Sequence, residues 1–289
     1  MEKIEKNRFT WVGSDPEKRE GIARPSVTYW QDALGRLRRN PVAMVCLGII
    51  LLLILSCILI PFFTPFDSRE QHLSCGNKGF MFQCVDSRYE GQNLVHVFGT
   101  DNLGRDLLVR TFEGGRVSLM IAFAAVAVNL VIGMIYGGIS GYFGGTVDNV
   151  MMRIVEVING IPFMIIMVLL MMVLPQGVFT MVIAYATTGW TGMARLVRGQ
   201  SLSLKNQEFV VAAEAMGAGA RRIIGKHLLP NTLSVVIINV TLAVPSAIFT
   251  EAFLSYIGLG VPVPNPSWGM LAQEGASLFQ LYPHPLWIP

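Results

Sequence analysis

Few residues of this sequence have the types and the spacing that covalent chemistry requires. Gly225-Lys226 comes nearest to a nucleotide-binding phosphate loop, but such a loop needs a glycine five positions before Gly225 and a serine or threonine after the lysine. Ala220 and His227 occupy those positions. The sequence contains no His-Glu-x-x-His run and no cysteine cluster with zinc spacing, so a hydrolytic metal has no ligand set. We therefore expect a protein that is not an enzyme and holds no cofactor of its own.

The composition indicates a membrane protein. Hydrophobic residues make up 52% of the 289 residues and charged residues only 14%, whereas soluble domains carry about a quarter charged residues. A formal charge of +3 is too small to suggest a nucleic-acid partner. A helix needs roughly 20 apolar residues to cross a bilayer core of about 30 Å. Stretches of this kind at 42–63, 117–139, 154–174, 178–193 and 233–257 predict an all-α polytopic membrane protein with five spans.

The basic residues predict the orientation in the bilayer. Nine of the 22 lysines and arginines precede Pro41, and an excess of such residues marks the cytoplasmic side. We therefore expect a cytoplasmic leader over 1–41, a first span over 42–63 and an extracellular loop over 64–116. In the leader, Ser26 is a candidate cap for a helix that lies flat on the inner membrane face, and a soluble amphipathic turn is the alternative. Five spans place the C-terminus outside, so we expect that a sixth span should follow and is missing.

The loop that returns to the cytoplasm has two short helical patterns. Asn206 is placed to cap the first, and Gly217 to end it in a left-handed conformation. Basic residues from Arg221 onward keep one side of the second pattern polar, and Pro230 marks the start of the next span. Because alanine and glycine permit close approach of backbones, the loop is either a docking element or an interfacial helix pair with no partner.

Two patterns concern packing inside the membrane. A glycine repeat with a spacing of four predicts close approach of another helix; it comprises Gly133, Gly137, Gly141 and Gly145. Polar residues in spans are costly against lipid, so they should face protein or a water-filled path. The candidates for lining a translocation path are Asn129, Asn159, Asn239 and Glu251. The alternative role for these residues is hydrogen bonding between helices.

The inner loop also carries a family resemblance. The pattern Ala212-Ala213, three residues, Gly217, nine residues, His227-x-Leu229-Pro230 resembles the EAA loop of permease subunits in binding-protein-dependent ABC importers. Two further pairs of segments, 98–106 with 115–119 and 254–260 with 266–269, resemble the second, C-type permease of the oligopeptide, dipeptide and nickel branch. The resemblance covers nearly the whole chain, and the leader is most similar to oligopeptide permeases.

The resemblance implies a fold and a contact surface. The fold is a type I ABC importer transmembrane domain of six spans, with its core over 117–289 and a coupling loop over 203–231. In that family the loop contacts the ATPase subunits. The implied contact residues are Glu208, Phe209, Ala212, Ala213, Glu214, Gly217, Arg221, His227 and Pro230. Val211 stands where the motif usually has glutamate, a role that Glu208 or Glu214 could take.

The resemblance also implies partners and a location. The partners are a homologous second permease, two ATPase subunits that bind ATP and Mg²⁺, and an extracellular binding lipoprotein or periplasmic protein. The location is the bacterial cytoplasmic (inner) membrane. The implied function is import of peptides, oligopeptides first, with dipeptides, nickel or another small solute as the alternative within the same class. A self-sufficient channel or secondary transporter and a membrane scaffold are the rivals from other classes.

The outer loop contains two sets of candidate residues. Asp101, Arg105 and Asp106 form either a local salt bridge that orders the segment or a contact with the binding protein. Cys75 and Cys84 are placed to form a disulfide outside the cell, which would stabilise the protein by about 2 to 3 kcal/mol. Free thiols are the alternative.

Overall fold

The computed structural model describes residues 29–84, 94–262 and 264–278. It divides into two units, with the boundary between Leu53 and Ile54. Helix α1 (Tyr29–Arg39) lies in the first unit, and the boundary falls within α2 (Pro41–Phe63). The helix predicted before the first span is therefore present, whereas Ser26, its predicted cap, lies outside the described residues.

Local chemistry explains both of these helices. In α1, Arg36 Nη2 lies 2.8 Å from Asp32 Oδ2, one helical turn away, and basic residues occupy the last turn, where they complement the helix dipole. Asn40 Oδ1 accepts a hydrogen bond from the backbone N–H of Ala43 at 3.2 Å, which satisfies one of the free donors at the start of α2. Helix α2 is apolar on all sides, as expected of a membrane span.

Between α2 and α3 the chain forms a small folded segment. A 3₁₀ turn, η3 (Leu73–Cys75), precedes the antiparallel strands β1 (Phe82–Cys84) and β2 (Leu94–His96). Gly104 has φ +74° and a Cβ there would overlap the carbonyl oxygen of His72, so this turn requires glycine. The predicted extracellular loop is thus structured in the part that the structure describes.

Helix α3 (Leu107–Phe143) has 37 residues and starts ten positions before the predicted span. Asp106 caps it, because its Oδ1 accepts a hydrogen bond from Val109 N at 2.9 Å. Residues 107–116 of the predicted extracellular loop are therefore helical. A helix of 37 residues is about 55 Å long, well beyond the hydrocarbon thickness of about 30 Å.

Two of the predicted spans are broken. The stretch 154–174 is divided between α4 (Gly145–Asn159) and α5 (Phe163–Val173), which are bent by 75°. Pro162 stands at the break and has no N–H to continue the helix. The stretch 178–193 is divided between α6 (Val178–Thr188) and α7 (Trp190–Lys205).

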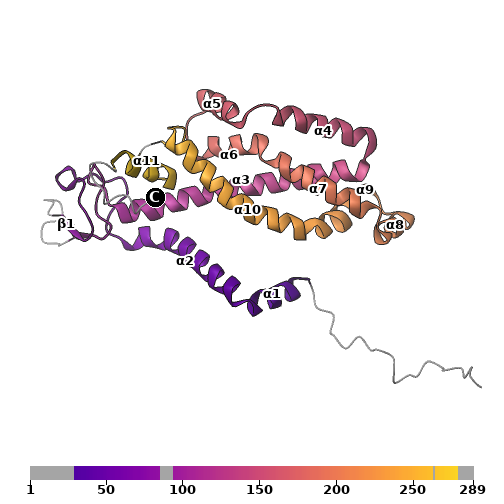
Figure 1. The fold of residues 1–289 in the computed structure, drawn as a ribbon, viewed down its shortest axis with the longest axis horizontal. Coiled ribbons are helices and arrows are strands. Elements are labelled where there is room, and N and C mark those ends of the chain that lie inside the picture. Colours follow the sequence, from indigo (N-terminus) through magenta and orange to yellow (C-terminus); the bar gives the residue numbers. More distant parts are fainter. Residues whose placement is uncertain (1–28, 85–93, 263, 279–289) are drawn as a thin grey trace, which may run out of the picture. The chain divides into compact units, whose positions relative to one another are not determined.

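The remaining helices complete the fold. Helix α8 (Glu208–Ala215), α9 (Ala220–Arg222) and the π-helix η5 (Ile223–Leu228) precede α10 (Leu229–Tyr256), and α11 (Trp268–Leu278) follows it. Within the second unit, α11 and β1 lie near the start of α3, and α8 and α9 lie near its end (Figure 1).

The described residues contain three helices that are long and apolar enough to cross a membrane. They are α2, α3 and the joined helix Ala220–Tyr256, and the bent pair α4–α5 would be a fourth. Helices α6 and α7, with 11 and 16 residues, are each shorter than a full span. The predicted span over 178–193 covers α6 and the first residues of α7.

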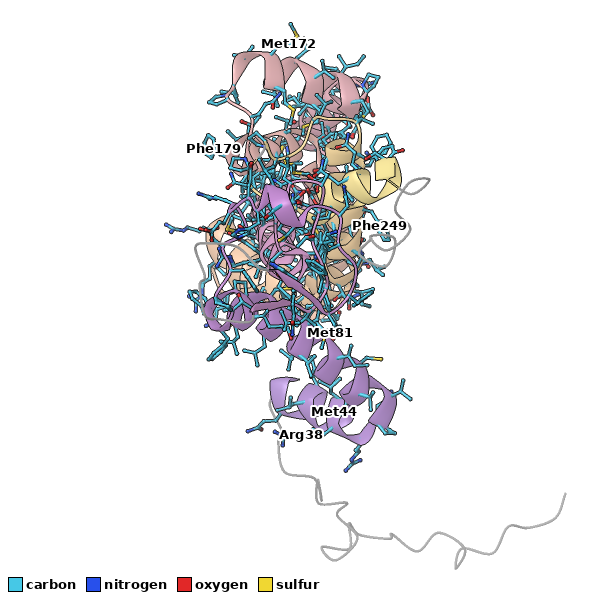
Figure 2. All side chains as sticks on the ribbon, turned by 90° about the vertical axis from the view of Figure 1, so that its left-hand side faces the viewer. Arg38, Met44, Met81, Met172, Phe179 and Phe249 are labelled. Atoms are coloured by element: carbon cyan, nitrogen blue, oxygen red, sulfur yellow. The ribbon has the colours of Figure 1, made fainter. Side chains whose placement is uncertain are left out.

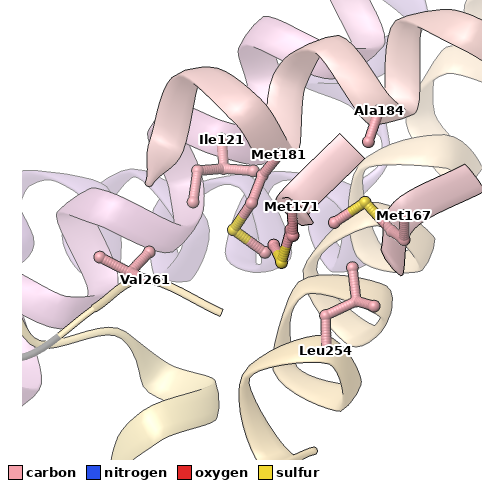
Figure 3. Packing of buried hydrophobic residues seen from close by; sticks show 7 residues of the cluster. All are labelled: Ile121, Met167, Met171, Met181, Ala184, Leu254 and Val261. Atoms are coloured by element: carbon pink, nitrogen blue, oxygen red, sulfur yellow. The ribbon is translucent and has the colours of Figure 1, made fainter. Parts of the chain in front are cut away.

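The core of the second unit lies where α3, α5, α6 and α10 meet. It contains Ile121, Met167, Met171, Met181, Ala184, Leu254 and Val261, all buried (Figure 3). Three of these residues are methionines, whose unbranched side chains adapt to irregular spaces between helices.

The glycine repeat of α3 packs against α7, as predicted. A Cβ at Gly133 would lie 2.6 Å from Met193 Cβ, and one at Gly141 would lie 2.6 Å from Ser201 Cβ. Gly137 faces the backbone of α7 between them. The fourth member, Gly145, has φ +53° and nothing within 4 Å of its Cβ position, so it starts α4 and takes no part in the contact.

The outer surfaces of these helices are apolar. Met172, Phe179 and Phe249 are exposed to 78%, 74% and 76% and point away from the ribbon (Figure 2). Exposed apolar side chains of this size are stable in a lipid environment and not in water.

Candidate coupling surface

The predicted coupling loop is a compact helical segment. Helix α8 begins after Gln207, which is its N-cap but makes no side-chain bond, so Asn206 does not cap it. Asn206 is the C-cap of α7 instead. The prediction for Gly217 is confirmed, because its φ is +84°. Gly217 N and Ala218 N donate to the carbonyls of Glu214 and Ala213 at 2.8 and 3.0 Å, the paired bonds of a Schellman motif.

One face of α8 packs against its own subunit, on a buried cluster that we term the seat. Val210 packs with Ile223 and Leu228, and all three are fully buried. Tyr142, at the end of α3, packs against the same cluster. Ala213 is only 4% exposed. It therefore offers little surface to a partner in this structure, and its contact with an ATPase subunit stays a prediction.

The opposite face of α8 is apolar and exposed. Phe209, Val211 and Met216 are 42%, 53% and 82% exposed. Glu208 and Ala212 are also exposed. Large apolar side chains on a polar loop outside the spans mark a surface that another protein covers. These residues form what we term the coupling face: Glu208, Phe209, Val211, Ala212 and Met216.

The end of α3 holds α8 in place. The hydroxyl of Tyr142 donates to Glu214 Oε1 at 3.2 Å. Lys205 Nζ donates to the carbonyl oxygen of Tyr142 at 2.7 Å and lies 5.4 Å from the centre of its ring. Glu214 is thus engaged within the subunit. Tyr142 and Lys205 are functional candidates that sequence reasoning missed, since nothing in the sequence indicates that α3 ends beside α8.

The second half of the loop leads into α10. Arg221 is exposed on α9, and His227 is half-buried in η5. The carbonyl oxygen of His227 accepts a hydrogen bond from Asn231 Nδ2 at 2.5 Å. Pro230 occupies the first turn of α10, where a missing N–H is harmless, which confirms its predicted place at the start of that helix.

The predicted outer salt bridge is present and larger than expected. Arg105 Nε lies 2.6 Å from Asp101 Oδ2, and Arg110 also pairs with Asp101. Glu274 on α11 bonds to Arg110 at 2.8 Å and to Arg105 at 3.3 Å. Asp106 Oδ2 lies 2.7 Å from His96 Nδ1. Asp101, Arg105 and Asp106 are each 3% exposed. They order the outer segment and offer little surface to a binding protein.

A second polar cluster lies deeper, between α3, α10 and α11. Glu251 is fully buried and accepts hydrogen bonds from Ser118 Oγ and Ser255 Oγ, each at 2.8 Å. Ser118 Oγ accepts from the backbone N–H of Trp268 at 3.1 Å. Glu251 therefore does not line an open path in this structure. It joins α10 to α3 and to the start of α11.

The three asparagines differ in their surroundings. Asn159 accepts a hydrogen bond from Thr191 Oγ1 at 3.0 Å, which links α4 to α7. Asn129 is half-buried, and its buried Oδ1 has no partner among the described residues. Asn239 is exposed and bonds only to Val235 O. Asn159 thus binds helices together, while a role in lining a path stays a prediction for Asn129 and Asn239.

The cysteines fall into two groups. Cys46 and Cys57 are free, and Cys75 is disulfide-bonded. The side chain of Cys84, the predicted partner of Cys75, lies outside the described residues.

Comparison with known proteins identifies the family. Residues 129–283 match the family described as "Binding-protein-dependent transport system inner membrane component". The chain belongs to this family. Residues 28–79 match the "N-terminal TM domain of oligopeptide transport permease C", so the permease family covers both units. The chain is an ABC importer permease of the inner membrane.

Similar full-length permeases are known. The chain is 44% identical over its whole length to the oligopeptide transport system permease protein OppC of Bacillus subtilis, covering 91% of that protein. It is 43% identical to the dipeptide transport system permease protein DppC of the same organism, over 92% of this chain and 80% of that protein. The OppC of Escherichia coli is 41% identical over 90% of this chain and 83% of that protein.

The fold also resembles a solved transporter. The inward-facing structure of the methionine ABC transporter MetNI matches with a TM-score of 0.52 and 18% identity, over 62% of this chain and 86% of that chain. The fold prediction of an ABC importer transmembrane domain is therefore confirmed.

Proposed function

We propose that this permease imports peptides, and that it moves when separate ATPase subunits bind and hydrolyse ATP with Mg²⁺. Relatives above 40% identity bear the names of oligopeptide and dipeptide permeases, which supports a peptide cargo. A homologous second permease completes the passage, and an extracellular binding protein delivers the peptide. The second permease and the binding protein both fit a family described by binding-protein-dependent transport.

The coupling face is the observation that carries the proposal. Phe209, Val211 and Met216 expose apolar side chains on one side of α8, and the other side of α8 packs into the buried seat. An ATPase subunit that covers this face can push on α8. The push reaches α3 through Tyr142 and reaches α10 through η5, because these elements share the buried seat. The spans then reorient around a central path in an alternating-access cycle.

Replacing Met216 by glutamate tests the docking. Met216 is 82% exposed, so the change should leave the subunit folded and place a charge in the covered surface. We expect the ATPase subunits that co-purify with the wild-type permease to be lost, together with peptide uptake. Ser203→Glu, an exposed position at the end of α7, adds the same charge outside the coupling face and should retain both. Full uptake by the Met216 variant would contradict the proposal.

Peptide length is tested in cells that lack this chain. Complementation with the wild-type gene should restore uptake of labelled peptides, and a comparison of dipeptides with pentapeptides separates the two named groups of relatives. Uptake that is the same with and without the chain would contradict the transport role altogether.

A further inference from the structure

Three exposed basic residues surround a hollow beside the coupling face. The hollow has a volume of about 600 Å³ and is lined by Gly219, Ala220, Arg221, Arg222, Gly225 and Lys226. We propose that Arg221, Arg222 and Lys226 form a basic docking face that receives acidic side chains of the ATPase subunit. This inference rests on the proposed function and adds the chemistry of the partner surface.

Two other basic residues nearby, Arg198 and Lys205, have side-chain hydrogen-bond partners within the described part of the subunit, unlike the three residues of the hollow. Arg198 bonds to Asp148 through two nitrogens, with Nη2 to Oδ2 at 2.5 Å. Lys205 bonds to the carbonyl oxygen of Tyr142. The three cations of the hollow are exposed and have no ion pair or side-chain hydrogen bond among the described residues. Within the described residues, none of these three charges is neutralised by an ion pair.

The acidic residues of the loop do not balance these charges. Glu214 is engaged by the hydroxyl of Tyr142, and Glu208 stands at the far end of α8. The hollow thus presents three positive charges beside an apolar face. A partner that fits both features has an apolar cleft with carboxylates at its rim.

The walls of the hollow allow a partner to approach closely. Gly219 and Gly225 have no side chains, and nothing lies within 4 Å of their Cβ positions. A helix or loop of the partner can therefore reach the backbone between the cations, where long side chains would otherwise keep it away.

The position along the helix favours a protein over a lipid headgroup. Ala220–Tyr256 forms one joined helix, and its apolar part starts near Leu233. Arg221 is about 12 residues before that point, or about 18 Å of helix. The headgroup layer beside the hydrocarbon core is only about 5 to 8 Å thick. Arg221 and Arg222 therefore extend past the headgroups into the aqueous phase.

Charge reversal tests the inference. The permease pair is placed in nanodiscs of uncharged phosphatidylcholine, and the ATPase subunits that co-purify with it are titrated back. We expect Arg221→Glu to weaken their binding by about tenfold or more, and Arg221→Lys to restore most of it. The wild-type interaction should also weaken between about 50 mM and about 500 mM NaCl, because salt screens exposed charges.

A matched control is Arg195→Glu, since Arg195 is an exposed basic residue of α7 that does not line the hollow. Equal binding by the Arg195 and Arg221 variants would overturn the inference. So would an effect that appears only in nanodiscs containing phosphatidylglycerol, because the basic face would then bind lipid. If charge reversal has no effect but Met216→Glu abolishes binding, the proposed function stands without the basic face. If the wild-type permease binds no ATPase subunit, both fail.

Discussion

A single methyl group at Gly137 should destabilise the packing of α3 on α7. A Cβ at this position would lie 2.9 Å from both Arg198 N and Val197 Cβ, and would overlap the carbonyl oxygen of Ala194. Ordinary contacts between carbon atoms lie at about 3.5 to 4.0 Å. The backbones must therefore separate by about 1 Å, because main-chain atoms cannot rotate out of the way as a side chain would.

The expected loss of stability follows from comparison with a glycine that has no neighbours. Overpacking of this kind costs about 1 to 3 kcal/mol. Gly199 lies on the exposed side of α7 with nothing within 4 Å of its Cβ position, so alanine there should stabilise the helix by up to about 1 kcal/mol. The two Gly→Ala variants should differ by about 1 to 4 kcal/mol.

The assay is thermal unfolding of the purified permease in the same lipid for Gly137→Ala, Gly199→Ala and the wild type. The difference corresponds to a gap of about 2 °C or more between the apparent melting temperatures of the two variants. Equal melting temperatures would refute the close approach of α3 and α7 on which the calculation depends.

Three other changes have definite expected outcomes. Asp101→Asn removes the charge that faces the fully buried Arg110, and should lower stability by about 3 to 5 kcal/mol in a thermal scan. As a control, Glu156→Gln alters an exposed ion pair and should change stability by less than about 1 kcal/mol. Tyr142→Phe removes one exposed hydrogen bond to α8, worth about 1 kcal/mol, so retention of ATPase subunits should fall by less than about tenfold; complete loss would show that the hydroxyl does more than hold α8. Glu251→Ala removes the carboxylate that accepts hydrogen bonds from two buried serine hydroxyls and should increase hydrogen exchange in α11; unchanged exchange would contradict its role in joining α10 to α11.

Part of this fold could be predicted from the sequence because its signals are local. Helix α2 is apolar on every side, so its length alone indicates a span. Gly217 ends α8 since a positive φ there suits glycine. The spacing of Gly133, Gly137 and Gly141 indicates a helix contact, although it does not reveal that α7 is the partner.

The sequence was less informative where residues far apart in the chain decide the local structure. Helix α3 starts at Leu107. In the sequence, the charge of Arg110 argues against a buried helix at this place, because its partner Glu274 lies far along the chain, on α11. The burial of Ala213 could not be predicted either, because an eight-residue helix shows no clear inner face until Ile223 and Leu228 pack against it. Breaks such as the one at Gly189 escape hydropathy, which averages over many residues.

The π-helix η5 has a consequence for the orientation of the whole inner segment. Leu229 N bonds to Ile224 O, five residues back instead of four, so this stretch contains one residue more than a regular helix would use. Each residue of an α-helix turns the chain by about 100°. A one-residue deletion within 223–228 would thus allow a regular helix there and leave α8 close to its present orientation. The same deletion in the regular part of α10 would instead rotate α8 by about 100° about the axis of α10 and carry Phe209 and Met216 away from the side on which they now stand.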